Sequence, residues 1–319
     1  MTFLRAIIAV FLMSSVARAA TVTDFTVPSA TDHHLLHLSD YAGKVVLINW
    51  WRTTCPWSQR ETPKLVELNS RYAGKGLVIV GISDDNASSV GSVAGYLKSR
   101  GVSWPVGLND QGEFVREVVP LGTGETPANY LVEPDGTITF LGLDRSADDW
   151  KKLESAVAAA TSKKGPAKPP FARRPLPAAP PLSLPDLHGK EFSSAGWAQK
   201  PVVVNFFTAQ SCDWSGAVLA RLSRDYAKRG LQVIGVDLFD NDPAVQSCVQ
   251  KHGASYPVLK GDQATQQAWL GSNKGWATFF VTRDGRVLKK IENSIEDGLE
   301  SVIFPAYAEQ LVSSGSHVH

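Results

Sequence analysis

The sequence predicts two α/β domains, each built on a mixed sheet with helices on both faces. The chain has 319 residues, of which 43% are hydrophobic and 20% charged, a length and composition that suit two globular domains. Apolar runs typical of buried strands alternate with helical patterns, and each series closes with a hairpin and a helix. The same series occurs twice along the chain.

Two diverged copies of one unit account for this recurrence. Residues 72–81 read YAGKGLVIVG and residues 226–235 read YAKRGLQVIG, while residues 103–106 and 255–258 read SWPV and SYPV. The spacing between matched segments drifts slowly along the chain, as small insertions and deletions would produce. A repeat of this length indicates a pair of whole domains and not a solenoid.

Each copy is expected to contain the same elements, because the apolar pattern changes period at matching points. For the first copy we expect a strand at 45–51, a helix at 56–72, a strand at 77–82, a helix at 88–99, a short strand around Pro105, a hairpin of 130–132 with 137–140 about a Pro-Asp-Gly turn, and a helix at 148–159. For the second we expect a strand at 201–207, a helix at 213–228, a strand at 231–237, a helix at 243–252, a hairpin around 283–285 and a helix from about 295 to 312.

The first residues have the features of a secretory signal peptide. A short positive segment precedes an apolar run at 6–16, and Ala17-Arg18-Ala19 fits the small-x-small cleavage pattern. The run is too short to span a bilayer. We therefore expect an exported protein, and the style of the signal favours a bacterial periplasm.

The predicted domain boundaries follow from these features and from a proline-rich stretch between the copies, which favours an extended spacer. They are a signal peptide at 1–19, a first domain at 20–162, a linker at 163–181, a second domain at 182–313 and a tail at 314–319.

Composition excludes several classes of function. A formal net charge of +1 gives no global electrostatic case for nucleic acid. Three cysteines exclude a disulfide-dense scaffold and a four-cysteine metal site. Five of the seven histidines could bind a metal, but a solvated loop and tail explain them more simply, so we expect no metal and no cofactor; the five are His33, His34, His37, His317 and His319.

The chemistry is expected where the first strand meets the first helix. The strand ends in Asn49-Trp50-Trp51, the helix begins with Cys55-Pro56-Trp57-Ser58, and Pro63 lies eight positions after the cysteine. This pattern resembles the thioredoxin superfamily and, within it, the periplasmic TlpA/ResA-like thiol–disulfide oxidoreductases. The resemblance covers roughly 22–160 and 182–312. It implies two thioredoxin-like domains and thiol–disulfide exchange.

Both copies depart from that family by having serine in place of the second cysteine. The first copy has Cys55 and Ser58, and the second has Cys212 and Ser215. A helix N-terminus stabilises a thiolate, but serine cannot resolve a mixed disulfide. We therefore expect monothiol exchange, with Cys55 as nucleophile and Ser58 as partner of the thiolate. The expected partners are cysteine-containing exported proteins or low-molecular-weight thiols.

The resemblance also implies a cis-proline facing the cysteine, and Thr126-Pro127 occupies that position. The groove beside Trp57, Thr126 and Pro127 would bind an extended peptide. In the second copy Trp214 and Trp276 occupy the matching places. A cis bond before tryptophan is costly, so this loop is expected to be trans.

The second copy is the weaker candidate for chemistry for two further reasons. Ala220 replaces Pro63, and Asp213 places a like charge beside the sulfur of Cys212. A buried acid that assists proton transfer is implied by the family, with Asp84 or Asp85 as candidates and Asp237 in the second copy. Capping of strand ends is the simpler explanation of these acids.

Cys248 is matched by Tyr96 in the first copy. It could be a core residue, or it could resolve an adduct on Cys212; alternatively Cys55 and Cys212 could pair. The open functional alternatives are monothiol exchange, a redox-inactive binding or scaffold protein, and an atypical peroxidase with Cys212 and Cys248. Arg52 and Ala209 stand where a one-cysteine peroxidase needs threonine or serine.

Overall fold

A computed structural model describes most of the chain. The described residues are 21–32, 34–112, 114–122, 124–163, 175–197, 199–209, 211–238, 240, 242–271, 275–292 and 298–313, without the side chains of 212–214 and 242. The predicted signal peptide at 1–19, the tail at 314–319 and most of the predicted linker lie outside them. Within the described residues, no helix is long and apolar enough to cross a membrane.

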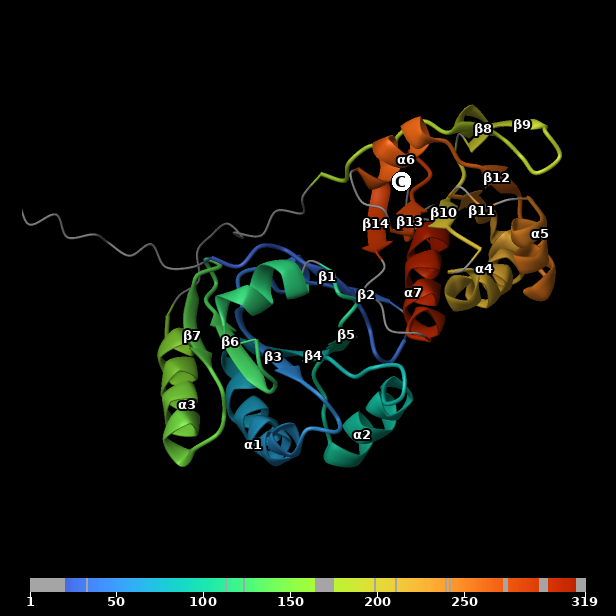
Figure 1. Ribbon diagram of the computed structural model, residues 1–319. Helices are drawn as coiled ribbons and strands as arrows, with labels where there is room; N and C mark the ends of the chain where they lie inside the picture. The colour runs from blue at the N-terminus through green and yellow to red at the C-terminus, as the bar shows by residue number, and fades with distance from the viewer. Residues whose placement is uncertain are drawn as a thin grey trace, which may run out of the picture.

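The first domain is a five-stranded mixed sheet in the order β5-β4-β3-β6-β7 (Figure 1). Strands β3, β4 and β5 are parallel, and β6 and β7 run antiparallel to their neighbours. The elements are β1 Thr26–Pro28, β2 Leu35–His37, η1 Leu38–Tyr41, β3 Val45–Trp51, α1 Pro56–Tyr72, η2 Ala73–Lys75, β4 Leu77–Ser83, η3 Val90–Ser92, α2 Val93–Arg100, β5 Val106–Leu108, η4 Phe114–Val118, η5 Val119–Leu121, β6 Ala128–Val132, β7 Ile138–Gly142 and α3 Ala147–Thr161.

The second domain repeats this topology with the order β12-β11-β10-β13-β14. Its elements are β8 Ser183–Pro185, β9 Glu191–Ser193, η6 Ser194–Trp197, β10 Val202–Phe207, α4 Cys212–Tyr226, η7 Ala227–Arg229, β11 Gln232–Asp237, α5 Asp242–Lys251, β12 Val258–Lys260, α6 Gln263–Leu270, β13 Ala277–Val281, β14 Val287–Glu292 and α7 Glu300–Ser313. The predicted fold class of two thioredoxin-like domains is confirmed.

The residues buried in β3 and α1 explain why the central strand and the first helix form. Every residue of β3 is buried, as the unbroken apolar run predicts. Helix α1 has Pro56 at its first position, where proline is tolerated because the missing N–H has no helical partner. Its buried side is formed by Ser58, Glu61, Thr62, Leu65 and Leu68. The helix therefore presents polar groups to the sheet near its start and apolar groups further along.

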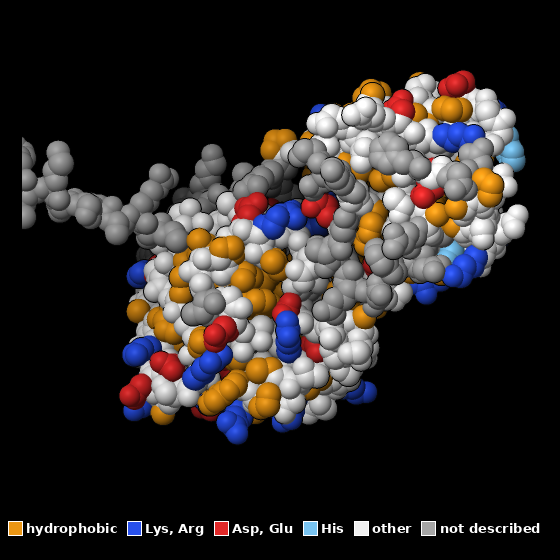
Figure 2. All heavy atoms as spheres, viewed as in Figure 1, with side chains coloured by type: hydrophobic (Ala, Val, Ile, Leu, Met, Phe, Trp, Pro, Cys, Tyr) orange, Lys and Arg blue, Asp and Glu red, His pale blue; other side chains and the backbone are white. Residues whose placement is uncertain are grey.

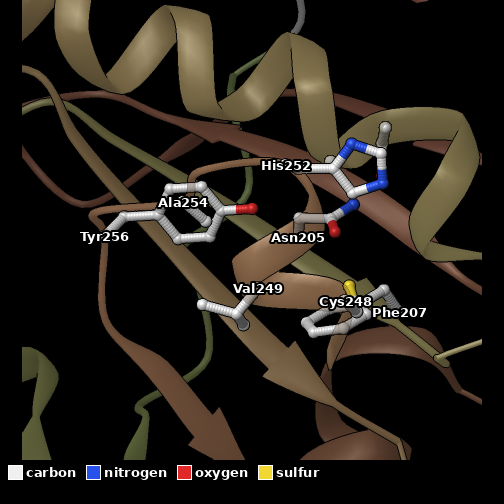
Figure 3. A pocket seen from close by; sticks show the side chains of 9 residues that line it. Asn205, Phe207, Cys248, Val249, His252, Ala254 and Tyr256 are labelled. Atoms are coloured by element: carbon white, nitrogen blue, oxygen red, sulfur yellow. The ribbon is translucent and has the colours of Figure 1, made fainter. Parts of the chain in front are cut away.

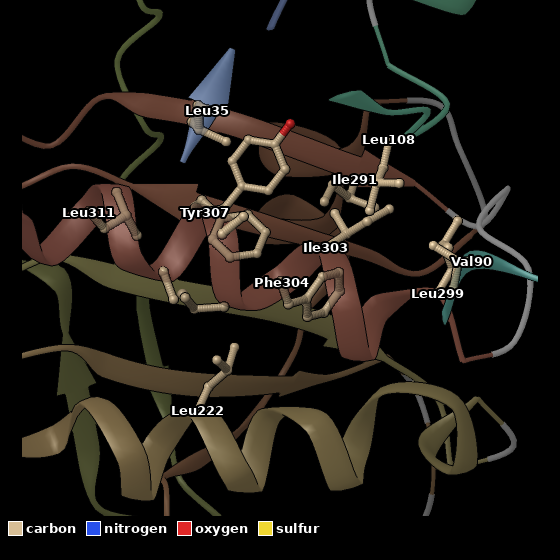
Figure 4. Packing of buried hydrophobic residues seen from close by; sticks show 14 of the residues in the cluster. Leu35, Val90, Leu108, Leu222, Ile291, Leu299, Ile303, Phe304, Tyr307 and Leu311 are labelled. Carbon is tan, nitrogen blue, oxygen red and sulfur yellow. The ribbon is translucent and has the colours of Figure 1, made fainter. Parts of the chain in front are cut away.

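Helix α7 belongs to the cores of both domains. It packs on β13 and α4 of its own domain and on β1 and β2 of the first domain. One hydrophobic cluster contains Leu35, Val90 and Leu108 of the first domain together with Ile303 and Tyr307 of the helix (Figure 4). The two domains therefore share a continuous apolar contact rather than only a linker.

A buried ion pair crosses this contact. Lys289 Nζ of β14 lies 2.9 Å from Asp110 Oδ2, and the two side chains are 2% and 0% exposed. Tyr307 donates its hydroxyl proton to the same carboxylate, and the backbone N–H of Gly112 donates to Asp110 Oδ1 at 2.9 Å. These hydrogen bonds compensate for removing the charges from water.

Acidic and basic side chains are interspersed on the face of the molecule drawn in Figure 2. Several charges on the surface are matched locally, for example Arg71 with Glu154 and Arg229 with Glu309. Exposed pairs of this kind contribute little to stability.

Candidate functional site

Cys55 lies where strand β3 turns into helix α1 and is the N-cap residue of that helix. It carries a free thiol and is partly buried. Its Sγ donates to the carbonyl oxygen of Thr126 at 3.7 Å. The unpaired backbone N–H groups and the positive end of the helix dipole lie at this terminus and stabilise negative charge on a sulfur atom.

The peptide bond between Thr126 and Pro127 is cis, as expected from the position of this proline. The contact with the Thr126 carbonyl places this bond beside Cys55. Trp57 follows two residues after the cysteine and is 38% exposed, unusually high for a large apolar side chain of this chain. The guanidinium carbon of Arg60 lies 5.1 Å from the centre of its ring. An exposed aromatic side chain therefore lies in the first turn of the helix that begins at the thiol.

Ser58 is 1% exposed and lies on the buried side of α1. Its Oγ accepts a hydrogen bond from the backbone N–H of Arg52 at 3.3 Å, which ties the end of β3 to the first turn of the helix. Among the described contacts, no hydrogen bond joins Ser58 to Cys55. Its expected role as partner of the thiolate stays a prediction.

Glu61 is a buried acid on α1 that was not expected from the sequence. Its side chain accepts hydrogen bonds from Asn49 Nδ2 at 2.9 Å and from Asn129 Nδ2. Burial raises the pKa of Glu61 to about 7, and the hydrogen bonds from the two asparagines oppose that rise. The available signal was spacing, since Glu61 lies three residues after Ser58 and so shares its helix face.

The two acids proposed from the sequence have other contacts. Asp85 is 5% exposed and accepts hydrogen bonds from the backbone N–H and the hydroxyl of Thr53. Asp84 pairs with the guanidinium of Arg52 and accepts from Asn109 at 2.6 Å. These contacts fit the capping of a strand end. The pairing also offsets the positive charge that Arg52 would otherwise place near the thiol.

The second domain keeps the framework of the site but not its acid. Helix α4 begins at Cys212, Ser215 is buried, and Asn205 donates to Thr278 Oγ1 at 2.9 Å. This pair matches Asn49 and Asn129 in the strand register, whereas Val218 stands where Glu61 would be.

The remaining predicted residues of the second domain are placed as follows. The Gly275–Trp276 bond is not among the cis bonds of the described residues, which agrees with the expected trans loop. The side chain of Trp214 lies outside the described residues. Asp237 is buried, and its Oδ2 accepts from the backbone N–H of Asp240 at 3.2 Å.

Cys248 lies on α5 and is disulfide-bonded. Cys55 is free, so the alternative in which Cys55 pairs with Cys212 is wrong for this structure. Cys248 also lines a small pocket together with Ser215 and Gly216 of α4 and His252 and Tyr256 (Figure 3). Cys248 is therefore not a free cysteine packed in the apolar core but a bonded cysteine beside a pocket.

Of the five histidines considered as metal ligands, His34 and His37 are described, and both have local contacts. His34 Nδ1 lies 3.5 Å from a carboxylate oxygen of Asp32, and His37 Nδ1 lies 2.8 Å from Thr26 Oγ1. His33, His317 and His319 lie outside the described residues. Where side chains are described, no three histidine, cysteine or acidic groups are arranged to hold a metal ion.

The curated proteins to which the chain is similar include several named thiol-disulfide oxidoreductase ResA. Thiol-disulfide oxidoreductase ResA of Bacillus thuringiensis subsp. konkukian is 30% identical over 105 residues, which cover 32% of this chain and 57% of that protein. ResA of Geobacillus kaustophilus is 27% identical over 144 residues, covering 44% and 79%. The chain thus spans little more than half the length of the first relative.

A solved structure described as a putative thiol:disulfide interchange protein DsbE from Chlorobium tepidum is 22% identical. It aligns with a TM-score of 0.40 over 45% of this chain and 96% of that one. The AhpC/TSA family model matches residues 19–141 and again residues 176–290. These two matches, one on each mixed sheet, establish that the chain belongs to the AhpC/TSA family.

Proposed function

We propose that the protein is exported and takes part in thiol–disulfide exchange through Cys55 as a single nucleophilic thiol. The observation that carries this proposal is the position of a free cysteine at the N-terminus of α1, against the carbonyl that precedes a cis-proline. The names of the relatives support the type of reaction. The partners would be cysteine-containing exported proteins or low-molecular-weight thiols.

In the proposed reaction the Cys55 thiolate attacks one sulfur of a substrate disulfide. The substrate S–S bond breaks, a Cys55–substrate disulfide forms, and the other substrate sulfur leaves as a thiolate. The exchange needs no further oxidant. Because Ser58 holds the place of a second cysteine, the adduct persists until another thiol attacks it.

Glu61 would accept the proton of the Cys55 thiol in this reaction. It lies two turns along the buried face of α1 from the cysteine, and its pKa of about 7 lets it exist in both protonation states near neutral pH. The neutral form avoids a buried negative charge while the thiolate is present, and the ionised form can accept the thiol proton. Asn49 and Asn129 fix the carboxyl group on the sheet.

Trp57 and the Thr126 carbonyl would bind the substrate chain. A carbonyl beside the nucleophile can accept a backbone N–H of an extended peptide, as in strand addition. An exposed indole supplies apolar contact area at small entropic cost. Both groups lie next to the reacting sulfur, so they would act on residues adjacent to the substrate disulfide.

The test is to incubate the protein with oxidised glutathione and measure adducts at each cysteine by peptide mass spectrometry. We expect a lasting glutathione adduct on Cys55, and its loss in Cys55→Ser. In the matched variant Ser58→Cys the adduct should be transient and be replaced by a disulfide within the motif. Failure of Cys55 to react in the folded protein would favour a redox-inactive binding or scaffold protein.

A further inference from the structure

We propose that the second domain contains a reversible dithiol–disulfide pair made of Cys212 and Cys248, with the second cysteine on helix α5 instead of in the motif. This site would accept two electrons from protein dithiols. The pair does not include Cys55, so its exchange is independent of monothiol exchange in the first domain.

The pairing follows from the cysteine count. The chain has three cysteines. Cys248 is disulfide-bonded and Cys55 is a free thiol. Within one chain, Cys212 is therefore the cysteine left to bond with Cys248.

The packing of the two helices agrees with this pairing. Ser215 and Gly216 of α4 line the same pocket as Cys248 of α5 and His252, which follows the end of that helix; Cys248 and His252 are labelled in Figure 3. Positions four residues apart lie on one face of a helix, so the face of α4 that carries Gly216 also carries position 212. Cys248 thus lies against the first turn of α4.

The first domain has a different residue at the matching place. Tyr96 of α2 occupies the position of Cys248, and its hydroxyl lies 2.9 Å from Thr62 Oγ1 of α1. Its ring centre lies 5.1 Å from that of Trp51. A tyrosine therefore contacts the first helix in one copy, while a cysteine faces the first helix in the other. The two copies have diverged into one monothiol site and one dithiol site.

The location of Cys212 makes the bond reducible. Position 212 is the first residue of α4, where free backbone N–H groups and the helix dipole stabilise a thiolate. Stabilising the thiolate stabilises the reduced pair, and this makes the disulfide a better oxidant. A disulfide between two helix interiors would lack this effect.

The electrons and protons of the reaction pass between the substrate dithiol and the cysteine pair, so no further oxidant is needed. One substrate thiolate attacks the Cys212 sulfur, the Cys212–Cys248 bond breaks, and Cys248 leaves as a thiolate that takes up a proton. The second substrate thiolate then attacks the substrate sulfur of the mixed disulfide and releases Cys212. The substrate dithiol loses two electrons and two protons and becomes a disulfide, and the pair gains them.

The first experiment maps disulfides in the unmutated protein without reduction. We expect a linked peptide containing Cys212 and Cys248, and alkylation of Cys55 alone. Alkylation of all three cysteines would overturn the pairing. This measurement requires no variant, so it does not depend on whether a substituted protein folds.

The second experiment tests exchange in a Cys55→Ser background, with mixtures of reduced and oxidised glutathione as the probe. We expect one transition between the bonded and fully reduced pair, without a lasting glutathione adduct. Adding Cys248→Ser should abolish that transition and leave a lasting adduct on Cys212, whereas adding Cys212→Ser should abolish both. A bond that persists through the whole series of buffers would show a purely structural disulfide and overturn the proposed exchange.

Discussion

Replacing Glu61 by glutamine should stabilise the protein at alkaline pH and have little effect at acid pH. The reason is the burial of this carboxyl group, which is 1% exposed. Burial raises its pKa from 4.5 to about 7, so the folded protein holds this proton more tightly than the unfolded chain does. Glutamine has nearly the same shape and carries no charge at any of these pH values.

The sign and size of the effect follow from linkage. The stabilisation that comes from the neutral carboxyl is fully present below about pH 4.5 and is lost as the pH rises through about 7. At about 1.4 kcal/mol for each pH unit between the two pKa values, the loss amounts to roughly 3 kcal/mol. Glu61→Gln removes this loss, and its one amide oxygen can still accept from either Asn49 or Asn129, although not from both as the two carboxylate oxygens do.

The assay is urea unfolding of both proteins between pH 5 and pH 8. The slope of the free energy of unfolding against urea concentration should be equal in the two proteins, which checks that the unfolded state is unchanged. The difference in free energy of unfolding should grow with pH toward that limit. Glu67→Gln is the matched control, because Glu67 lies on the same helix with an exposed side chain. A difference between Glu61→Gln and the parent that is equal at pH 5 and pH 8 would refute the argument.

Three further predictions concern the contact between domains and the substrate groove. Lys289→Met leaves the Asp110 carboxylate buried without its cation and should cost about 3–5 kcal/mol in urea unfolding, while adding Asp110→Asn should restore part of that loss. Gly112→Ala should destabilise the protein because a Cβ there would collide with Lys289 Nζ; Gly95→Ala has open space and should instead be neutral or stabilising, as compared by thermal unfolding. Trp57→Ala should slow adduct formation at the adjacent thiol with a disulfide-containing peptide more than with oxidised glutathione, and equal slowing in stopped-flow assays would contradict a role in peptide binding.

Much of the fold could be predicted from local patterns. The apolar run at Val45–Trp51 and the proline at position 56 specify a buried strand followed by a helix start, and the structure has both. The strand and the helix start depend on neighbouring residues, so a single sequence contains the necessary information. The cis bond at Pro127 was expected instead from the resemblance to the thioredoxin superfamily.

Helix boundaries were less predictable where side chains compete with the backbone. The helix expected at 88–99 begins only at Val93, after a short 3-10 turn at Val90–Ser92. Asn86 Oδ1 accepts from the backbone N–H of Ser88 and from the hydroxyls of Ser88 and Ser89. These local bonds favour a turn over a helix. Helix α6 at Gln263–Leu270 was not expected either.

The parts of the site that could not be predicted depend on contacts distant in sequence. Glu61 is buried because Asn49 and Asn129, from two strands, supply its hydrogen bonds. The bonding of Cys248 depends on how α5 packs against α4, and connectivity of cysteines cannot be deduced from spacing alone. The burial of Asp110 and Lys289 depends on how the two domains pack against each other, which local sequence patterns do not reveal.

The place of α7 in both cores has a consequence for the order of folding. Chains are synthesised from the N-terminus, and N-terminal domains usually fold first. Here the apolar surface around Leu35, Val90 and Leu108 is covered by Ile303 and Tyr307, which are made only after the strands of the second domain. A nascent chain would carry that uncovered surface until α7 has been made, and an expression vector that stops after the first domain would leave it open to aggregation.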